Sequence, residues 1–206
     1  SRLYLKTVAP RVEGEVKKGD VVQAGVVISN SEVGLGALRI QPMIFRLVCT
    51  NGMIAGDPVR RYHVGRLIDS DEAVSIFGDE TLRADDKAYW LKVRDVVKAA
   101  VSEARFQDLL AKMRFSATTE PIADVAHGVE MLAQRFSLSG DEQSSVLHHL
   151  AIGGDLTQWG TLNAVTRASQ DMESYERATE LEAVGGSILG MTDHEWATVA
   201  AGRVAS

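Results

Sequence analysis

The chain has 206 residues, of which 45% are hydrophobic and 24% are charged, a composition typical of a globular protein long enough to bury a sizeable core. No apolar run approaches the ~18–20 residues that cross a membrane, so the sequence predicts no membrane association. The single Cys49 excludes an internal disulfide framework and is typical of the reducing cytoplasm. The first residues, SRLYLKTVAPR, lack the apolar core of a signal peptide and begin within a predicted strand, so we expect upstream residues to be missing.

The charge is divided unevenly along the chain. Residues 1–66 contain ten Arg and Lys against five Asp and Glu, a balance of +5, and residues 67–206 contain twelve against twenty-three, a balance of −11. A basic first section favours a polyanion partner, with chance variation of surface composition as the alternative. Contacts between basic and acidic sections of different copies also predict a homo-oligomer.

The first third of the chain is predicted to form a β-sheet. Alternating and β-branched residues predict strands at residues 2–8, 12–16, 21–29, 37–41 and 44–49. Pro42 has no N–H group to donate, so it is predicted to mark a bulge, a kink or an edge. The Asn51-Gly52 pair that follows the last strand predicts a tight turn.

The rest of the chain is predicted to be helical. Apolar residues at helical spacing from Leu82 to Phe115, including Trp90 and Leu91, predict one long helix or two helices that break at Ser102. Further helices are predicted at residues 121–135, with Pro121 in the first turn, at 139–152, 157–168 and 173–184, and after Thr192. Capping-box spacing supports two of these starts, Ser139 with Glu142 and Thr192 with Glu195, and Gly185-Gly186 is predicted to end the helix before it.

These elements predict an α+β fold, with a mainly antiparallel N-terminal sheet followed by a helical C-terminal section. Residues 1–66 are expected to form the β-rich section with the basic cluster, and residues 67–206 the helical section, packed on the sheet as one domain. The Asp, Ser and Gly content of residues 67–81 is typical of a loop at the boundary.

Three stretches of the sequence resemble a known family. They are GVVISNSEVGLGALRIQPMIFRLVCTNGMI with RRYHVGR, then WGTLNAVTRASQ, then ERATELEAVGG. In this order they resemble the phage/plasmid-like family of domain-of-unknown-function proteins, found on bacteriophages, prophages and conjugative plasmids. The resemblance spans Val16 to Gly186, and its most specific pieces are SNSEVG, CTNGM and NAVT. It implies a role in DNA metabolism, such as recombination or strand annealing, and carries over no catalytic activity.

Arginines of the first section suggest a surface for a polyanion. Guanidinium groups bind phosphates in bidentate fashion, and a row of them along a sheet would follow a nucleic-acid backbone, with Phe45, Tyr62 and Tyr4 available for base stacking. The alternative is that Arg39 and Arg46 pair with acidic helices packed on the sheet. The predicted nucleic-acid-binding residues are Arg39, Arg46, Arg60, Arg61, His63 and Arg66.

A second set of polar residues lies in predicted turns and at a helix start. These residues are Asn30, Glu32, Asn51 and Asn163. They either cap backbone groups, as turn residues do, or form a polar site. Asn163 and Thr166 are three residues apart and share one helix face, from which they bind a ligand or tie the helix to the N-terminal sheet.

Catalytic chemistry has fewer signals in the sequence. Cys49 and His63 could act as nucleophile and base only if the thiol were exposed, and Cys49 ends an apolar run that predicts its burial in the sheet. The chain has no CxxC or HExxH spacing, so no metal, cofactor or catalytic residue is predicted.

The function predicted first is that of a cytoplasmic, phage- or plasmid-encoded protein of DNA metabolism that binds single-stranded nucleic acid. One alternative is a structural or protein-interaction protein without nucleic-acid affinity. The other is a hydrolase or transferase with a site near Asn30, Glu32 and His63.

Overall fold

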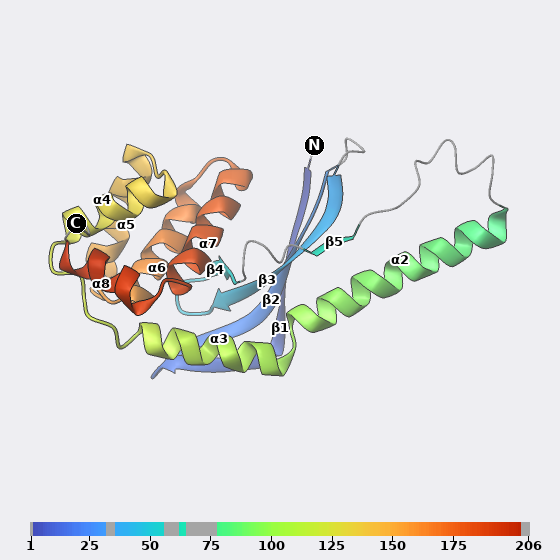
Figure 1. Ribbon diagram of the computed structural model, residues 1–206, viewed down its shortest axis with the longest axis horizontal. Coiled ribbons are helices and arrows are strands. Elements are labelled where there is room, and N and C mark those ends of the chain that lie inside the picture. The colour runs from blue at the N-terminus through green and yellow to red at the C-terminus, as the bar shows by residue number, and fades with distance from the viewer. Residues whose placement is uncertain (1, 32–35, 56–61, 65–77, 203–206) are drawn as a thin grey trace.

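An antiparallel sheet and a set of helices make up the fold, which confirms the predicted α+β class (Figure 1). The computed structural model describes residues 2–31, 36–55, 62–64 and 78–202, and for residues 2, 3, 30, 31, 36, 37 and 62–64 it describes the backbone alone. Within these residues no helix is long and apolar enough to cross a membrane.

The strands pair in the order β1-β2-β3-β4, with β5 also pairing with β3. Their bounds are β1 Arg2–Lys17, β2 Asp20–Ser31, β3 Gly36–Arg46, β4 Asn51–Ile54 and β5 Tyr62–Val64. β2 occupies one edge of β3, whereas β4 and β5 lie one after the other along its other edge. Pro42 lies between these two pairings, and its carbonyl accepts a hydrogen bond from Ala55 N on that edge at 2.9 Å. The N–H and C=O groups of one strand residue point to the same side of the strand. The missing N–H of Pro42 therefore lies on the edge of β3 between β4 and β5, where no neighbouring strand would accept a hydrogen bond from it.

Two predicted breaks between strands differ from the structure. The strands predicted at residues 2–8 and 12–16 form one strand, β1, with a register shift between Ala9 and Glu13 where the predicted gap lies. The tight turn predicted at Asn51-Gly52 is wrong, because the chain turns at residues 47–50 and Asn51 begins β4. Thr50 supplies the reversal, since its φ is 51°, in the left-handed region.

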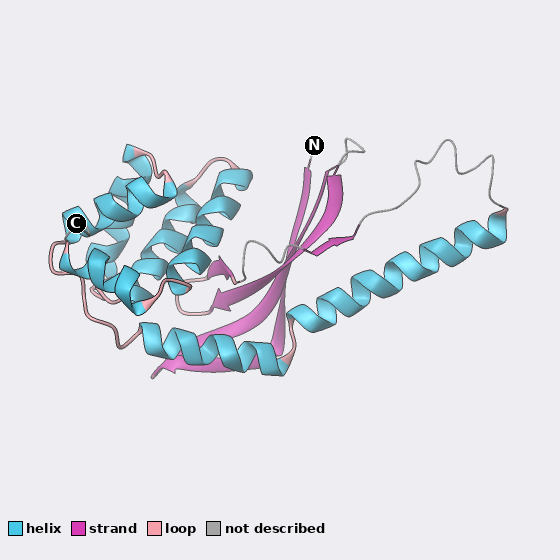
Figure 2. Ribbon diagram, viewed as in Figure 1, coloured by secondary structure: helices cyan, strands magenta, loops and turns pink. Residues whose placement is uncertain are grey.

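Helices follow the sheet in chain order and form a bundle beside it, apart from a long first helix that extends away (Figures 1 and 2). Their bounds are α2 Asp79–Ala100, α3 Glu103–Ser116, α4 Val125–Phe136, α5 Gly140–Gly153, α6 Gln158–Ala168, α7 Tyr175–Leu189 and α8 Asp193–Ala201, with a 3₁₀ turn at Ser169–Asp171. The break at Ser102 and both capping boxes are as predicted. The helix predicted from Pro121 begins instead at Val125, capped by Asp124.

α7 does not end at the two glycines that were predicted to stop it. It continues through Gly185 and Gly186 to Leu189. A Cβ atom at Gly185 would overlap the methyl group of Thr166 in α6, and one at Gly186 would overlap the carbonyl oxygen of Ile54 in β4. These glycines therefore allow α7 to lie close to its neighbours, and this tertiary contact outweighs their low helix propensity.

Helices cover one face of the sheet, which is apolar by alternation, and α7 also covers part of the opposite face, where Val27, Met43 and Ile54 are buried beside Ala183. Near the β4 end the core of the first face packs against α3, α6 and α7, and near the other end α2 packs on Val26 and Ile40 through side chains that include Val93 and Val97. The residues of β2 and β3 on the first face are Val22, Ala24, Val26, Ile28, Leu38, Ile40 and Ile44. The two ends of the sheet therefore carry different helices, and the predicted site residues divide between these ends.

Candidate functional site

Arg46 lies at the β4 end of the sheet in an internal ion pair. Its Nε and Nη2 atoms donate to the two carboxylate oxygens of Asp20, at 2.6 and 2.8 Å, and its guanidinium lies over the ring of Trp159 at 5.8 Å from the centroid. Trp159 Nε1 donates to the same carboxylate at 2.9 Å. Burial acts to lower the pKa of Arg46, but the hydrogen bonds and charge of Asp20 prevail and the pKa is raised. The partner of Arg46 is therefore a residue of the sheet itself and not an acidic helix.

Asn51 and Asn163 are brought together beside this ion pair. The Nδ2 atom of Asn51 donates to Thr166 Oγ1 at 2.6 Å and to Asn163 Oδ1 at 3.3 Å, and Asn163 Nδ2 donates to Trp159 O at 2.7 Å. Asn51 is 2% exposed, so these bonds form in the interior, where each counts for more than at the surface. They tie β4 to α6, as the structural interpretation of Asn163 and Thr166 predicts. We call this group, Asp20, Arg46, Asn51, Trp159, Asn163 and Thr166, the junction.

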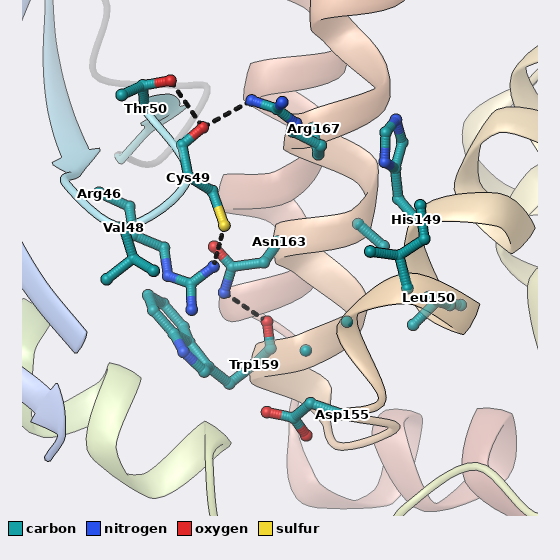
Figure 3. Close-up of a pocket in the computed structure, with 14 residues that line it drawn as sticks. Arg46, Val48, Cys49, Thr50, His149, Leu150, Asp155, Trp159, Asn163 and Arg167 are labelled. Carbon is teal, nitrogen blue, oxygen red and sulfur yellow. Dashed lines mark hydrogen bonds between the residues drawn. The ribbon is translucent and has the colours of Figure 1, made fainter. Parts of the chain in front are cut away.

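A cavity of about 340 Å³ opens between the turn after β3 and the helices α5 and α6 (Figure 3). Arg46, Cys49, Asn163 and Arg167 all line it. Arg167 Nη1 donates to the carbonyl oxygen of Cys49 at 2.6 Å, and Arg46 Nη1 donates to the Cys49 sulfur at 3.2 Å. Cys49 was predicted to be buried in a strand, and this is wrong: it is half-buried, because it belongs to the turn.

The cavity wall also holds Asp155, which forms an ion pair with Lys17 of β1 and accepts hydrogen bonds from Thr157 N and Oγ1. Burial raises the pKa of Asp155, but the bonds from Lys17 and Thr157 outweigh it, so the pKa is lowered. With Arg46 paired to Asp20 and Asp155 paired to Lys17, these charges balance within the protein. The arrangement holds the sheet and helices together.

Arg39 lies at the other end of the sheet, on the face opposite α2. In the strand register Tyr4 pairs with Ser29, Ser29 with Arg39, and Arg39 with His63. Paired residues of neighbouring strands share a face, so Tyr4, Ser29 and Arg39 form a row across three strands. The Arg39 side chain is exposed.

An aromatic ring from α7 extends this row. Tyr175, which is 46% exposed, lies against Tyr4 with ring centroids 4.8 Å apart, and Lys6 Nζ lies 5.0 Å from the Tyr175 centroid. Gln41 shares the face with Arg39 by the two-residue period. Tyr4, Lys6, Ser29, Arg39, Gln41 and Tyr175 are called the sheet-face surface.

Lys6 is also part of an ion pair beneath this surface. Its Nζ lies 2.6 and 2.7 Å from the two carboxylate oxygens of Glu182 in α7. Glu182 is 5% exposed, and burial raises its pKa although Lys6 acts in the opposite direction. Lys6 therefore fixes α7 to β1, and Arg39 is left as the cation of the row that faces outward.

The remaining predicted residues are only partly described. Glu32, Arg60, Arg61 and Arg66 lie outside the described residues, and for Asn30 and His63 only the backbone is described. Asn30 pairs with Leu3 near the end of β2, whereas Arg46, the strand partner of Asn51, pairs with Val22 near its start. The structure thus places Asn30 and His63 near Arg39, and Asn51 and Asn163 at the junction.

Three residues of these two places, Asp20, Trp159 and Tyr175, are not among the predicted site residues. Their partners are distant in sequence: 26 positions separate Asp20 from Arg46, and 139 separate it from Trp159. Local spacing cannot show such contacts.

An antiparallel sheet that is joined to a helical bundle by the hydrogen bonds of the junction and by the ion pair of Lys6 with Glu182 defines a mixed α+β protein. The chain belongs to the family described as Domain of unknown function (DUF932), whose profile matches residues 1–183. This agrees with the resemblance of the sequence at the level of a family of domains of unknown function. No curated protein and no solved structure matches the chain.

Proposed function

We propose that this protein binds single-stranded nucleic acid on the sheet-face surface, as a phage- or plasmid-encoded protein of DNA metabolism that acts in the cytoplasm as a homo-oligomer. The observation that carries the proposal is the row of Tyr4, Ser29 and Arg39 across three strands, with Tyr175 beside it. The positive balance of residues 1–66 supports it.

The chemistry of this row matches the needs of an unpaired strand. Accessible tyrosine rings stack on bases of any sequence, and of the two here Tyr175 is exposed and Tyr4 is half-buried. A guanidinium group contacts a neighbouring phosphate in bidentate fashion. Ser29 and Gln41 add a hydroxyl and an amide that can exchange hydrogen bonds with base edges. A duplex would offer its phosphates but not its stacked bases, so the two tyrosines favour the single strand.

A salt series on a fluorescently labelled single strand, followed by anisotropy, tests the proposal. We expect wild-type affinity to fall steeply with salt, and Arg39→Ala to weaken binding and reduce the salt slope by about 0.7. Arg39→Lys should recover part of the lost affinity, because lysine restores the positive charge but not the bidentate guanidinium contact. Arg135→Ala is the matched control, since it removes the same charge from α4, where Arg135 pairs with Glu195 on the surface.

Two results would overturn the proposal. If wild-type protein ignored single strands even at low salt, the structural or protein-interaction alternative would replace it. If Arg39→Ala and Arg135→Ala had the same affinity and the same salt slope, the sheet-face surface would not be the binding site.

A further inference from the structure

α2 carries a row of cations with a tryptophan in its middle. Arg83, Lys87, Trp90, Arg94 and Lys98 follow one another at spacings of four, three, four and four residues. Residues at these spacings lie above one another on a helix, so the five side chains form one ridge. At about 1.5 Å per residue the ridge is roughly 22 Å long. We call it the α2 ridge.

The α2 ridge faces solvent along its whole length. All five side chains are exposed, and Trp90 is 64% exposed with the 40% exposed Leu91 beside it. The helix packs on the sheet through another side, where Val93, Val97 and Ala100 contact Val26 and Ile40. The first turns of α2 also extend beyond the sheet (Figure 1).

The cations of the α2 ridge are not neutralised by strong ion pairs within the protein. In the part of the chain that the structure describes, Arg83, Lys87 and Lys98 have no hydrogen bond or ion pair, and Arg94 contacts only its neighbour Asp95 at 3.0 Å. Arg94 and Asp95 are both more than half exposed, and such a surface pair contributes little and is readily exchanged for another anion. The Lys6 and Arg46 charges described above are held by buried carboxylates, so the ridge differs from them.

We propose that the α2 ridge is a second binding surface for single-stranded nucleic acid, on which the four cations contact phosphates and Trp90 stacks on an unpaired base. The inference rests on the proposed function. An acidic protein segment would satisfy the cations but would leave the tryptophan ring without a stacking partner, and a duplex would offer no free base face. The combination of four cations with one exposed indole favours the unpaired strand.

The ridge and the sheet-face surface belong to opposite sides of the sheet. α2 covers the face that holds Val26 and Ile40, whereas Arg39 lies on the other face, next to Tyr175 of α7. α2 and α7 accordingly lie on different sides of the strands (Figure 1). One strand cannot follow both surfaces without passing around an edge, so two sites of this kind hold two strands on one molecule.

Tryptophan fluorescence tests the inference directly, because the chain has three tryptophans and Trp159 and Trp196 are only 2% and 3% exposed. Quenching by added oligodeoxythymidylate therefore reports mainly on Trp90. We expect quenching in wild-type protein, protection of Trp90 from iodide by the bound strand, and a loss of affinity of about five-fold or more in Trp90→Ala.

Lys87→Gln and Lys92→Gln form a matched pair, since both remove a lysine charge from exposed positions of α2 and only Lys87 lies on the ridge. We expect Lys87→Gln to reduce the salt slope by about 0.7 and Lys92→Gln to leave it unchanged. Circular dichroism checks that both variants keep their helix content.

Each outcome separates the inference from the proposed function. If wild-type protein bound strands without quenching, and Lys87→Gln matched Lys92→Gln, the α2 ridge would be excluded while Arg39→Ala still tested the sheet-face surface. If wild-type protein bound no strand at low salt, both would fail. If Trp90→Ala and Lys87→Gln lost binding and Arg39→Ala did not, the α2 ridge would be the binding site and the sheet-face surface would be excluded.

Discussion

Asp20 receives three hydrogen bonds at the junction, two from Arg46 and one from Trp159. Its side chain is 8% exposed and that of Arg46 is 19% exposed, so neither charge can be hydrated fully if the other is removed. The Asp20–Arg46 pair therefore stabilises the fold, whereas the exposed Arg39 is free to contact a ligand.

We expect Asp20→Ala to lower the free energy of unfolding by about 3–5 kcal/mol, because it leaves the Arg46 guanidinium buried without a counter-charge. Urea titration followed by tryptophan emission measures the change, and Asp95→Ala, at a side chain that is 65% exposed, is the control and should shift the midpoint little. Equal midpoints for the two variants would contradict the structural assignment of Asp20.

The sequence placed Arg46 correctly in a strand, but it could not identify the partner. Both interpretations of Arg46, a nucleic-acid contact and a pair with an acidic helix, were reasonable from composition, because residues 67–206 supply twenty-three acidic side chains. The partner is instead Asp20, at the end of the Lys17-Lys18-Gly19-Asp20 turn and across the ladder from the end of β3. Local sequence patterns show which residues are polar, but they do not show which of these residues contact one another in the fold.

At the scale of elements, the close packing of α7 against α6 and β4 depends on two glycines, Gly185 and Gly186. We expect Gly186→Ala to be strongly destabilising, because its Cβ would overlap the Ile54 carbonyl oxygen and only a shift of α7 or β4 could relieve the overlap. Gly140→Ala, in the first turn of α5, has no atom within 4 Å of the added Cβ and should be neutral or stabilising by about 0.5–1 kcal/mol. Thermal unfolding of both variants measures the difference, and a stable Gly186→Ala variant would mean that α7 is less tightly packed than described.

An ion pair between the buried Glu142 of α5 and the partly exposed Arg177 of α7 gives a pH dependence with a definite sign. The Glu142 carboxylate accepts hydrogen bonds from Arg177 Nε and Nη2 at 2.6 and 2.8 Å and from Ser139 N at 2.8 Å. The bonds from Arg177 are the largest cause of a lowered pKa for Glu142, against burial, which raises it. A carboxyl group with a lowered pKa stabilises the fold above its usual value of 4.5 and loses this contribution as pH falls through the lowered pKa.

We therefore expect the stability difference between wild-type protein and Arg177→Met to be largest above about pH 4.5 and to shrink as the solution is acidified. Urea midpoints measured across this range give the profile. Arg94→Met, which removes an exposed cation from α2, should follow the wild-type profile. Parallel profiles for wild type and Arg177→Met would show that Glu142 is not the titrating group.

Two helix starts were predictable, because a cap is a local feature: Ser139 with Glu142 and Thr192 with Glu195 form the capping boxes that their spacing predicts. The end of α7 and the turn after β3 were not predictable for the opposite reason. Gly185 and Asn51 follow local rules for stops and turns, but contacts with Thr166 override both rules.

At the scale of the whole molecule, the backbone amides should differ widely in their protection from hydrogen exchange. α6 buries most of its residues between α5, α7 and the sheet, whereas α2 has Ala100 as its single fully buried residue among those described. We expect backbone amides of α6 to exchange with solvent most slowly, and those of residues 79–88 to exchange much faster. Hydrogen exchange followed by mass spectrometry checks this order, and slow exchange in residues 79–88 would show that another surface covers α2.

The α+β class could be predicted because alternation and helical spacing persist over long segments. The α2 ridge escaped prediction because Trp90 and Leu91 were counted only as apolar residues at helical spacing, and both are exposed. Periodicity identifies an amphipathic helix, but a wide apolar stripe does not reveal which of its edges the sheet leaves uncovered.

The bond between Asn51 and Thr166 joins residues that are 115 positions apart, and this separation determines the order of events during synthesis. At about 5–20 residues per second, the strands β1–β4 leave the ribosome roughly 6–23 seconds before α6 is complete. During that interval Val22, Ala24 and Ile44 lack the cover of α6 and α7, and a nascent sheet with an incompletely covered apolar face is a target for chaperones and for aggregation. We therefore expect the yield of folded protein in the cell to depend on how long the unfinished sheet avoids aggregation, as well as on the stability of the finished molecule.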